Sequence, residues 1–268
     1  AYNEWMEGGR TQEGLNEFKP LMEAVKTVYP NDPVVRMYNL ENVIWGEELI
    51  SHRTDAPRWA RLQRELIARC MRVIHWWIDE RQKPNGSFGG GINDDVEALR
   101  SWPLAIIAVN DEKAQMGALK LSDGVWNSGV LENGYSRVCW DIQHSAEESS
   151  DTQPQFIGVR YGDPERIWRN LLPLRCMRDV WTGINPQGYR HFKSAYVSAT
   201  KIKTEGNRPV DVPYATRAVK HGHWLAWYSQ IPEVKQLMTE WAAAWVAASM
   251  RSDRGKPRGV PPAAIDFA

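Results

Sequence analysis

Helical periodicity is the sequence feature that most constrains the fold of this chain. Apolar residues recur at steps of three and four through most of its length, whereas the alternation typical of strands is rare. The clearest case is the segment 59–78, where Trp59, Leu62, Leu66 and Ile74 fall on one helical face. The same spacing predicts further helices at 14–29, 34–51, 95–109, 111–126, 144–161, 164–182, 215–230 and 232–251. The sequence therefore predicts an all-α fold.

The connections between the predicted helices are of two kinds. Short links such as 110–111 and 162–163 alternate with long glycine-rich segments at 83–94, 127–143 and 183–213. The long segments carry Trp, Tyr, Arg and His, and ordered loops of this kind commonly shape a functional cleft. We expect one domain over 1–268, an (α/α) toroid or incomplete barrel of antiparallel helical hairpins with long loops at one end. The apolar, loop-like C-terminal sequence favours a truncated part of a longer enzyme.

Composition excludes several classes of protein. No apolar run approaches the roughly 20 residues that span a bilayer, so we expect no membrane partner. Lys plus Arg and Asp plus Glu both number 33, which leaves no overall field to attract nucleic acid. The three cysteines lack the paired spacing of a zinc site or a disulfide framework. The 14 Trp residues suit both helix packing and stacking on sugar rings.

The first polar cluster follows the glycine-rich segment near residue 90. Asn93, Asp94 and Asp95 stand at the start of a predicted helix that contains Trp102. One of the three is expected to be the helix N-cap, and the others to face a ligand. A divalent cation near Asp94 and Asp95 is an option, although we expect no required cofactor and no dedicated metal site. The Lys-Ser/Thr pair of a phosphate-binding loop is missing.

The second cluster, within 135–151, is the densest group of catalytic residue types. On a helix, His144, Glu147, Glu148 and Asp151 lie at i, i+3, i+4 and i+7 and share one face. A histidine beside carboxylates is held in one tautomer, as a general base requires. The alternative is an ordinary solvated helix face.

The third cluster, 188–196, alternates in a way that predicts a short extended segment. One face would present Tyr189, His191 and Lys193, a combination that can bind an acidic sugar and move a proton. A salt-bridged surface hairpin is the alternative. His221 and His223 are interpreted as core histidines.

These clusters resemble those of secreted glycan-degrading enzymes with an (α/α) toroid, a group that contains polysaccharide lyases, heparinase-like enzymes and six-hairpin glycosidases. The resemblance covers about 57–203 and rests on the segments 89–95, 141–148 and 188–193. It implies a Tyr or His that removes the C5 proton of a uronate, with Asn or Arg neutralising the carboxylate. It also implies a secreted or periplasmic location and a polysaccharide or oligosaccharide substrate.

Three functions remain open from the sequence. In β-elimination, which we favour, His144 is the base, Tyr189 or Tyr196 the acid, and Arg137 and Arg190 bind the substrate carboxylate. In inverting hydrolysis, Asp94 or Asp95 works with Glu147 or Glu148. A non-catalytic carbohydrate-binding module is the third. The residues expected to contact substrate are Asn93, Asp94, Trp102, Tyr135, Arg137, Trp140, Glu148, Arg190, His191 and Lys193.

Overall fold

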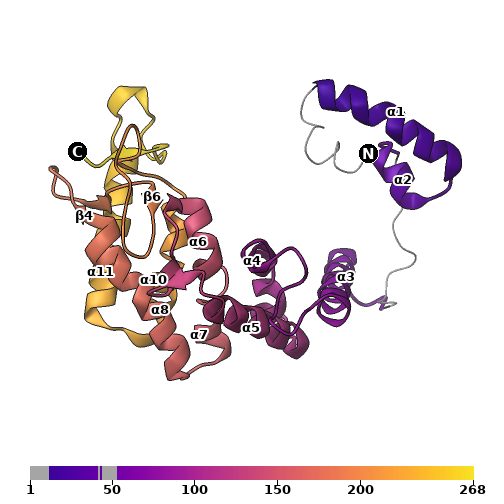
Figure 1. Ribbon diagram of the computed structural model, residues 1–268, viewed down its shortest axis with the longest axis horizontal. Helices are drawn as coiled ribbons and strands as arrows, with labels where there is room; N and C mark the ends of the chain where they lie inside the picture. The colour runs from indigo at the N-terminus through magenta and orange to yellow at the C-terminus, as the bar shows by residue number, and fades with distance from the viewer. Residues whose placement is uncertain (1–11, 42, 44–52) are drawn as a thin grey trace. The chain divides into compact units, whose positions relative to one another are not determined.

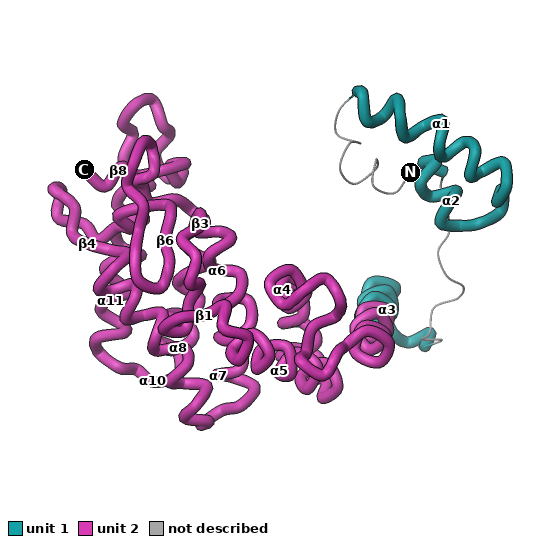
Figure 2. The backbone as a smooth tube through the Cα atoms, in the orientation of Figure 1, with its two compact units in different colours: residues 1–67 teal, residues 68–268 magenta. Residues whose placement is uncertain are grey.

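The computed structural model describes residues 12–41, 43 and 53–268 (Figure 1). The chain divides into two compact units, 1–67 and 68–268, which are described separately (Figure 2). Among the described helices, none has both the length and the apolar composition that a membrane span requires.

In the first unit, two helices form an ion-paired hairpin. Helix α1 (Gln12–Val28) buries Phe18 and Met22, which lie four residues apart on one face. Helix α2 (Pro33–Tyr38) begins at Asp32, whose carboxylate accepts the amide hydrogens of the first turn, and Pro33 suits the first helical position. The helix predicted at 34–51 thus ends at Tyr38, and its last part lies largely outside the described residues.

Helices make up most of the second unit, and the predicted positions of these helices are confirmed. Helix α3, which begins before residue 68, spans Arg58–Glu80. The others are α4 (Ile92–Ser101), α5 (Glu112–Asn127), α6 (Ile142–Ser150), α7 (Phe156–Val159), α8 (Pro164–Cys176), α9 (Ala215–Ala218), α10 (Lys220–Ser229) and α11 (Pro232–Met250), with π-turns η2 (Leu104–Ala108) and η3 (Met177–Trp181) and the short η4 (Asp253–Gly255). The prediction at 144–161 missed a break between α6 and α7, where Pro154 lacks the amide hydrogen that a continuous helix needs.

The prediction of an all-α fold is wrong, because the long loops form small antiparallel sheets. Of the residues that the structure describes, 59% are helical and about 8% are in strands. Four two-stranded ladders pair β1 (Leu131–Glu132) with β2 (Tyr135–Ser136), β3 (Trp140–Asp141) with β6 (Tyr196–Val197), β4 (Thr182–Ile184) with β5 (Arg190–Phe192), and β7 (Val210–Asp211) with β8 (Ile265–Asp266). Strands of two or three residues are too short to show alternation, yet they satisfy backbone groups in ordered loops.

The main core lies where α8, α10 and α11 run beside one another and the β4–β5 hairpin closes over them (Figure 1). Trp181 is fully buried there, with its ring centroid 4.3 Å from that of Tyr135 and stacked 6.0 Å from that of Phe192. Its indole N–H donates to the Ser198 carbonyl at 2.7 Å. Among the described residues, Trp102, Trp181 and Trp241 are buried and serve packing, whereas six other Trp residues are exposed.

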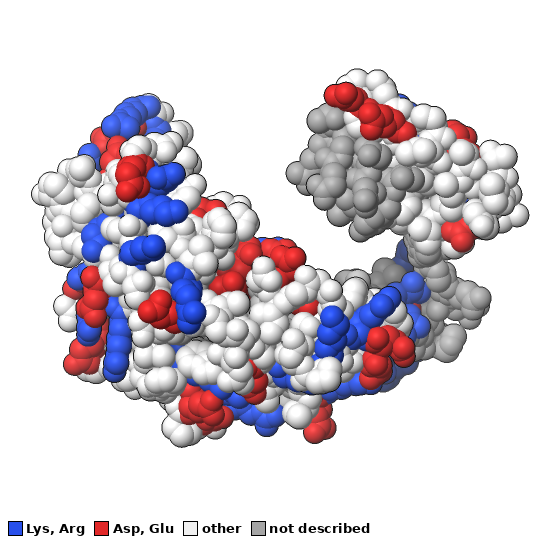
Figure 3. All heavy atoms as spheres, viewed as in Figure 1, with Lys and Arg blue, Asp and Glu red and all other residues white. Residues whose placement is uncertain are grey.

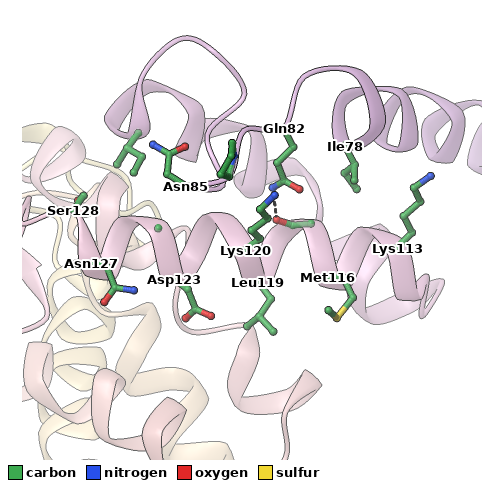
Figure 4. Close-up of a pocket in the computed structure, with 14 residues that line it drawn as sticks. Ile78, Gln82, Asn85, Lys113, Met116, Leu119, Lys120, Asp123, Asn127 and Ser128 are labelled. Carbon is green, nitrogen blue, oxygen red and sulfur yellow. Dashed lines mark hydrogen bonds between the residues drawn. The ribbon is translucent and has the colours of Figure 1, made fainter.

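The glycine-rich loop before α4 packs against α5 through positions that admit no side chain. A Cβ at Gly124 would overlap the Asn85 carbonyl, and a Cβ at Gly86, whose φ is +90°, would overlap the backbone of Lys120. Figure 4 shows the pocket beside this contact, where Gln82 Nε2 donates to the Gly117 carbonyl at 2.7 Å. The close approach fixes the loop, and with it the start of α4.

Candidate functional site

Two of the three predicted clusters meet around helix α6. Helix α6 contacts α4, β3 and β6, and β3 pairs with β6 so that Asp141 lies opposite Tyr196. Helix α4 and strand β6, which carries Tyr196, therefore both lie beside α6 (Figure 1). We call this surface, formed by α4, β3, α6 and β6, the α6 site.

A histidine and an aspartate are joined at the first turn of α6. Asp141 is the N-cap, and its Oδ1 accepts the amide hydrogens of Gln143 at 3.1 Å and His144 at 3.2 Å. Its Oδ2 lies 2.6 Å from Nδ1 of His144. Because Nδ1 carries the hydrogen of this bond, Nε2 of the exposed imidazole is free to take a proton from a ligand. The carboxylate that holds His144 is thus Asp141, whereas the sequence pattern grouped His144 with Glu147, Glu148 and Asp151.

Two adjacent glutamates on α6 have carboxyl groups that burial favours in the neutral form. Burial raises the pKa of Glu147, while Arg217, whose Nη1 lies 2.8 Å from Oε1, opposes the rise. Burial also raises the pKa of Glu148, against a hydrogen bond from Ser136, and Oε2 of Glu148 has no partner among the described residues. The carboxylate of Glu97 on α4 adds to the rise at Glu147. The solvated-face alternative fails for these two residues, since both are partly buried.

Asp151 anchors the last turn of α6 and does not face a ligand. Its side chain is fully buried and accepts hydrogen bonds from Arg217 and, at 2.6 Å, from Lys220 Nζ. Arg217 also binds the Gln143 carbonyl at 3.2 Å, so it ties α9 along the length of α6. Sequence reasoning missed Arg217 because a single arginine more than sixty residues from α6 carries no motif.

Aromatic and cationic side chains lie on β3, β6 and the following loop. Trp140 is exposed at the end of β3. The guanidinium carbon of Arg208 lies 4.8 Å from the centroid of the Tyr196 ring, within cation–π range. Arg208 also pairs with Glu205 at 3.3 Å. Arg208 was not predicted as a site residue, because it lies in a loop whose sequence has no helical or strand periodicity.

The two acids that follow the glycine-rich loop differ in role, because Asp95 holds the loop and Asp94 is exposed. The carboxylate of Asp95 accepts the amide hydrogens of Phe88, Gly89 and Gly90 at 2.6, 3.1 and 3.1 Å, so both its oxygens are directed at the loop. The predicted N-cap is wrong, since α4 is preceded by Gly91 and begins without a side-chain cap.

The remaining residues of the first cluster have no such role. Asn93 and Asp94 are exposed, whereas Trp102 is buried and packs on Phe88 at 5.5 Å between centroids. Among the described residues, no three or more His, Cys, Asp or Glu side chains are grouped to hold a metal ion. Both oxygens of Asp95 accept hydrogen bonds from backbone amides of the loop. The carboxylate therefore points at the loop and is poorly oriented to bind a cation.

Tyr135 and Arg137, at the N-terminal end of the second cluster, differ in their exposure to solvent. Tyr135 is fully buried, its hydroxyl lies 3.4 Å from Oγ of Ser145, and burial raises its pKa. A substrate on the surface does not reach it. Arg137, two residues further on, is exposed.

Apart from Tyr196 on β6, the third cluster lies against α11 and not on α6. The predicted extended segment is confirmed as β5. Arg190 donates through Nε to Glu240 of α11 at 2.7 Å and through Nη1 to Thr182 at 3.0 Å. His191 is buried, whereas Tyr189 is exposed and Lys193 is partly exposed.

His221 and His223 were both interpreted as core histidines, and this is right for His221 only. His221 is fully buried between Ser149, Ser150 and Asn170, and burial, with a smaller contribution from Lys220, lowers its pKa to about 3. His223 is exposed on α10. The three cysteines are free thiols, of which Cys139 and Cys176 are buried.

No protein-family model, no curated protein and no solved structure matches this chain.

Proposed function

We propose that the α6 site belongs to a carbohydrate-active enzyme, a lyase that cleaves a uronic-acid-containing polysaccharide by β-elimination. The observation that carries the proposal is the 2.6 Å contact between His144 Nδ1 and Asp141 Oδ2, with Tyr196 opposite Asp141 across the β3–β6 pair. This arrangement supplies a base with a fixed tautomer, next to a strand that carries a tyrosine. A secreted or periplasmic location belongs to the same proposal, because polysaccharides of this kind are extracellular.

In the proposed reaction, Nε2 of His144 takes the proton from C5 of the uronate. The C4–O bond breaks, a C4–C5 double bond forms, and the leaving oxygen takes a proton from the Tyr196 hydroxyl. Arg208 supplies the positive charge that stabilises the substrate carboxylate while negative charge develops at C5. It takes the place expected of Arg190, whose guanidinium is held by Glu240. Exposed Trp140 offers a face for stacking on a neighbouring sugar.

The experiment measures products from a panel of acidic polysaccharides, including polygalacturonate, alginate and a glycosaminoglycan. Ultraviolet absorbance reports the unsaturated sugar, and a reducing-end assay reports any cleavage. We expect His144→Ala to lower turnover by about 10²- to 10⁴-fold, the range for loss of a general base. Asp141→Asn should also lower it by removing the charge that holds the imidazole. His223→Ala, which changes an exposed histidine on α10, is the matched control and should leave turnover unchanged.

An alternative function, inverting hydrolysis, is favoured by the raised pKa of Glu148. A carboxyl whose pKa is raised by burial holds its proton to higher pH, which suits a general acid on a glycosidic oxygen. Hydrolysis gives new reducing ends without ultraviolet absorbance, and Glu148→Gln should then abolish them. Binding without either product would instead identify a non-catalytic carbohydrate-binding module, and the enzyme proposal would be wrong.

A further inference from the structure

A separate cavity of about 710 Å³ lies between the β4–β5 hairpin, the C-terminal end of α11 and the segment 251–268. Its volume falls within the range of small-molecule sites. We call it the His191 cavity, because the buried side chain of His191 forms part of its wall. The residues of the α6 site described above do not line it.

The wall of the cavity holds a histidine in a fixed orientation. Nδ1 of His191 lies 3.0 Å from Oδ2 of the fully buried Asp211, and the imidazole meets the Trp245 ring edge to face. The same Oδ2 accepts the indole hydrogens of Trp241 and Trp245 at 3.1 and 3.0 Å and the amide hydrogen of Phe192 at 3.2 Å.

This orientation leaves the second ring nitrogen for another partner. Since Nδ1 is committed to Asp211, Nε2 is the ring nitrogen that remains for a hydrogen bond to a ligand. Four groups thus donate to one carboxylate oxygen. Together they fix the position of the Asp211 carboxylate, and the carboxylate in turn fixes the orientation of the His191 ring.

Two further side chains give the cavity donors for an anion. Asn185 is only 7% exposed, and its Oδ1 accepts the Tyr189 amide hydrogen at 2.9 Å, which leaves its Nδ2 hydrogens for a ligand. Arg251 donates through Nε to Asp253, so the Nη groups of its guanidinium remain available. Lys256 contributes charge, although its ammonium donates to three backbone carbonyls.

The charged side chains around the cavity favour a negative ligand. Arg251 pairs with Asp253 and Arg254 pairs with Asp266 at 3.7 Å, so the charged side chains that line the cavity carry a net excess of one positive charge, that of Lys256. A guanidinium with free Nη hydrogens pairs with a carboxylate through two parallel hydrogen bonds. A buried imidazole nitrogen is suited to a hydroxyl or a carboxylate oxygen.

We propose that the His191 cavity binds a small hydroxylated carboxylate, the class to which free uronic acids belong. Arg251 and Asn185 donate to the carboxylate, and Nε2 of His191 forms a hydrogen bond with a hydroxyl of the same molecule. The choice of a sugar acid rests on the proposed function, since β-elimination releases acidic sugars, whereas the requirement for a carboxylate rests on the cavity alone.

The test is calorimetric titration of the whole chain with glucuronate and galacturonate, with glucose and galactose as the neutral counterparts. We expect the acids to bind and the neutral sugars not to bind. Arg251→Gln should weaken the acids by about tenfold or more, as expected for losing a charge-assisted hydrogen bond. His191→Ala should weaken them as well, and unchanged near-ultraviolet circular dichroism will show that this variant is folded.

A matched variant makes the test specific. Arg258→Gln removes an exposed arginine of the same segment that does not line the cavity, and it should bind like the wild type. The titration measures affinity for small acids and the lyase assay measures an unsaturated product, so a failed lyase assay and a failed binding assay are separate results. Equal binding of neutral and acidic sugars, no binding of either acid, or wild-type affinity in Arg251→Gln would each overturn the proposal. Arg251 is exposed, so its variant stays informative even if His191→Ala does not fold.

Discussion

The buried charges that join α6 to α9 and α10 give the sharpest test of how this fold is held together. Asp151 is fully buried and meets two cations, Arg217 and Lys220, while Glu147 meets Arg217 from the neighbouring turn. Two negative and two positive charges balance within this group. Asp151→Asn keeps the shape of the side chain but leaves one positive charge in excess beside a buried guanidinium.

The expected cost follows from the burial of Arg217, whose side chain is 8% exposed. Burial alone lowers the pKa of Arg217, and the hydrogen bonds to Asp151 and Glu147 more than reverse that effect. Removing one partner of a buried ion pair costs about 3–5 kcal/mol, because the remaining charge is left without compensation. For a chain of this size, that corresponds to a fall in Tm of roughly 6–20 °C.

The assay is urea unfolding followed by tryptophan fluorescence and by far-ultraviolet circular dichroism. Arg178→Gln is the matched control, since Arg178 and Asp179 form an exposed pair that should contribute less than about 1 kcal/mol. Adding Arg217→Met to Asp151→Asn should recover part of the loss by removing the uncompensated charge. If Asp151→Asn and Arg178→Gln have the same free energy of unfolding, the reasoning from buried charge is refuted.

Three other predictions test particular residues. Burial raises the folded-state pKa of Glu148 above its ordinary 4.5. The contribution of Glu148 to the free energy of unfolding is therefore most favourable below pH 4.5, where the carboxyl is neutral, and falls as the pH rises through the folded-state pKa. Glu148→Gln should therefore be more stable than the wild type at neutral pH but not in acid, as thermal unfolding across pH will show. Gly124→Ala should cost about 1–3 kcal/mol in denaturant titrations by forcing Asn85 away from α5. Since burial raises the pKa of Cys176 to about 11, this thiol should alkylate more slowly at pH 8 than Cys70, which mass spectrometry of the labelled peptides can measure.

Helices were predictable from the sequence because their evidence is local. Periodicity along α3, α5 and α11 spans several turns, and Pro164 and Pro232 mark the starts of α8 and α11. The small sheets were not predictable, because each strand has two or three residues and its partner can lie far away. Asp141 meets Tyr196 and Asp211 meets Ile265 only after the intervening helices have packed.

The candidate site was predictable in its local part only. The helical spacing of His144 and Glu147 placed them on one helix, and that helix is present. Arg217 and Arg208 were missed because each reaches the site through a tertiary contact that no spacing encodes. A residue type in a motif does not reveal its partner either, as Asp95 shows by binding three amides of its own loop.

The positions of His144 and His191 separate two roles that the sequence placed in one cleft. Each imidazole has its Nδ1 on an aspartate, but Asp141 is a partly exposed helix cap, whereas Asp211 is fully buried and accepts the hydrogens of two indole rings. An exposed imidazole can approach a long polymer chain, whereas a buried one in a cavity wall can meet only a molecule that enters the cavity. We therefore expect changes at His144 to act on polysaccharide turnover and changes at His191 to act on the binding of small acids. A variant that altered both equally would show that the two sites are energetically coupled, with a coupling free energy that a double-mutant cycle can measure.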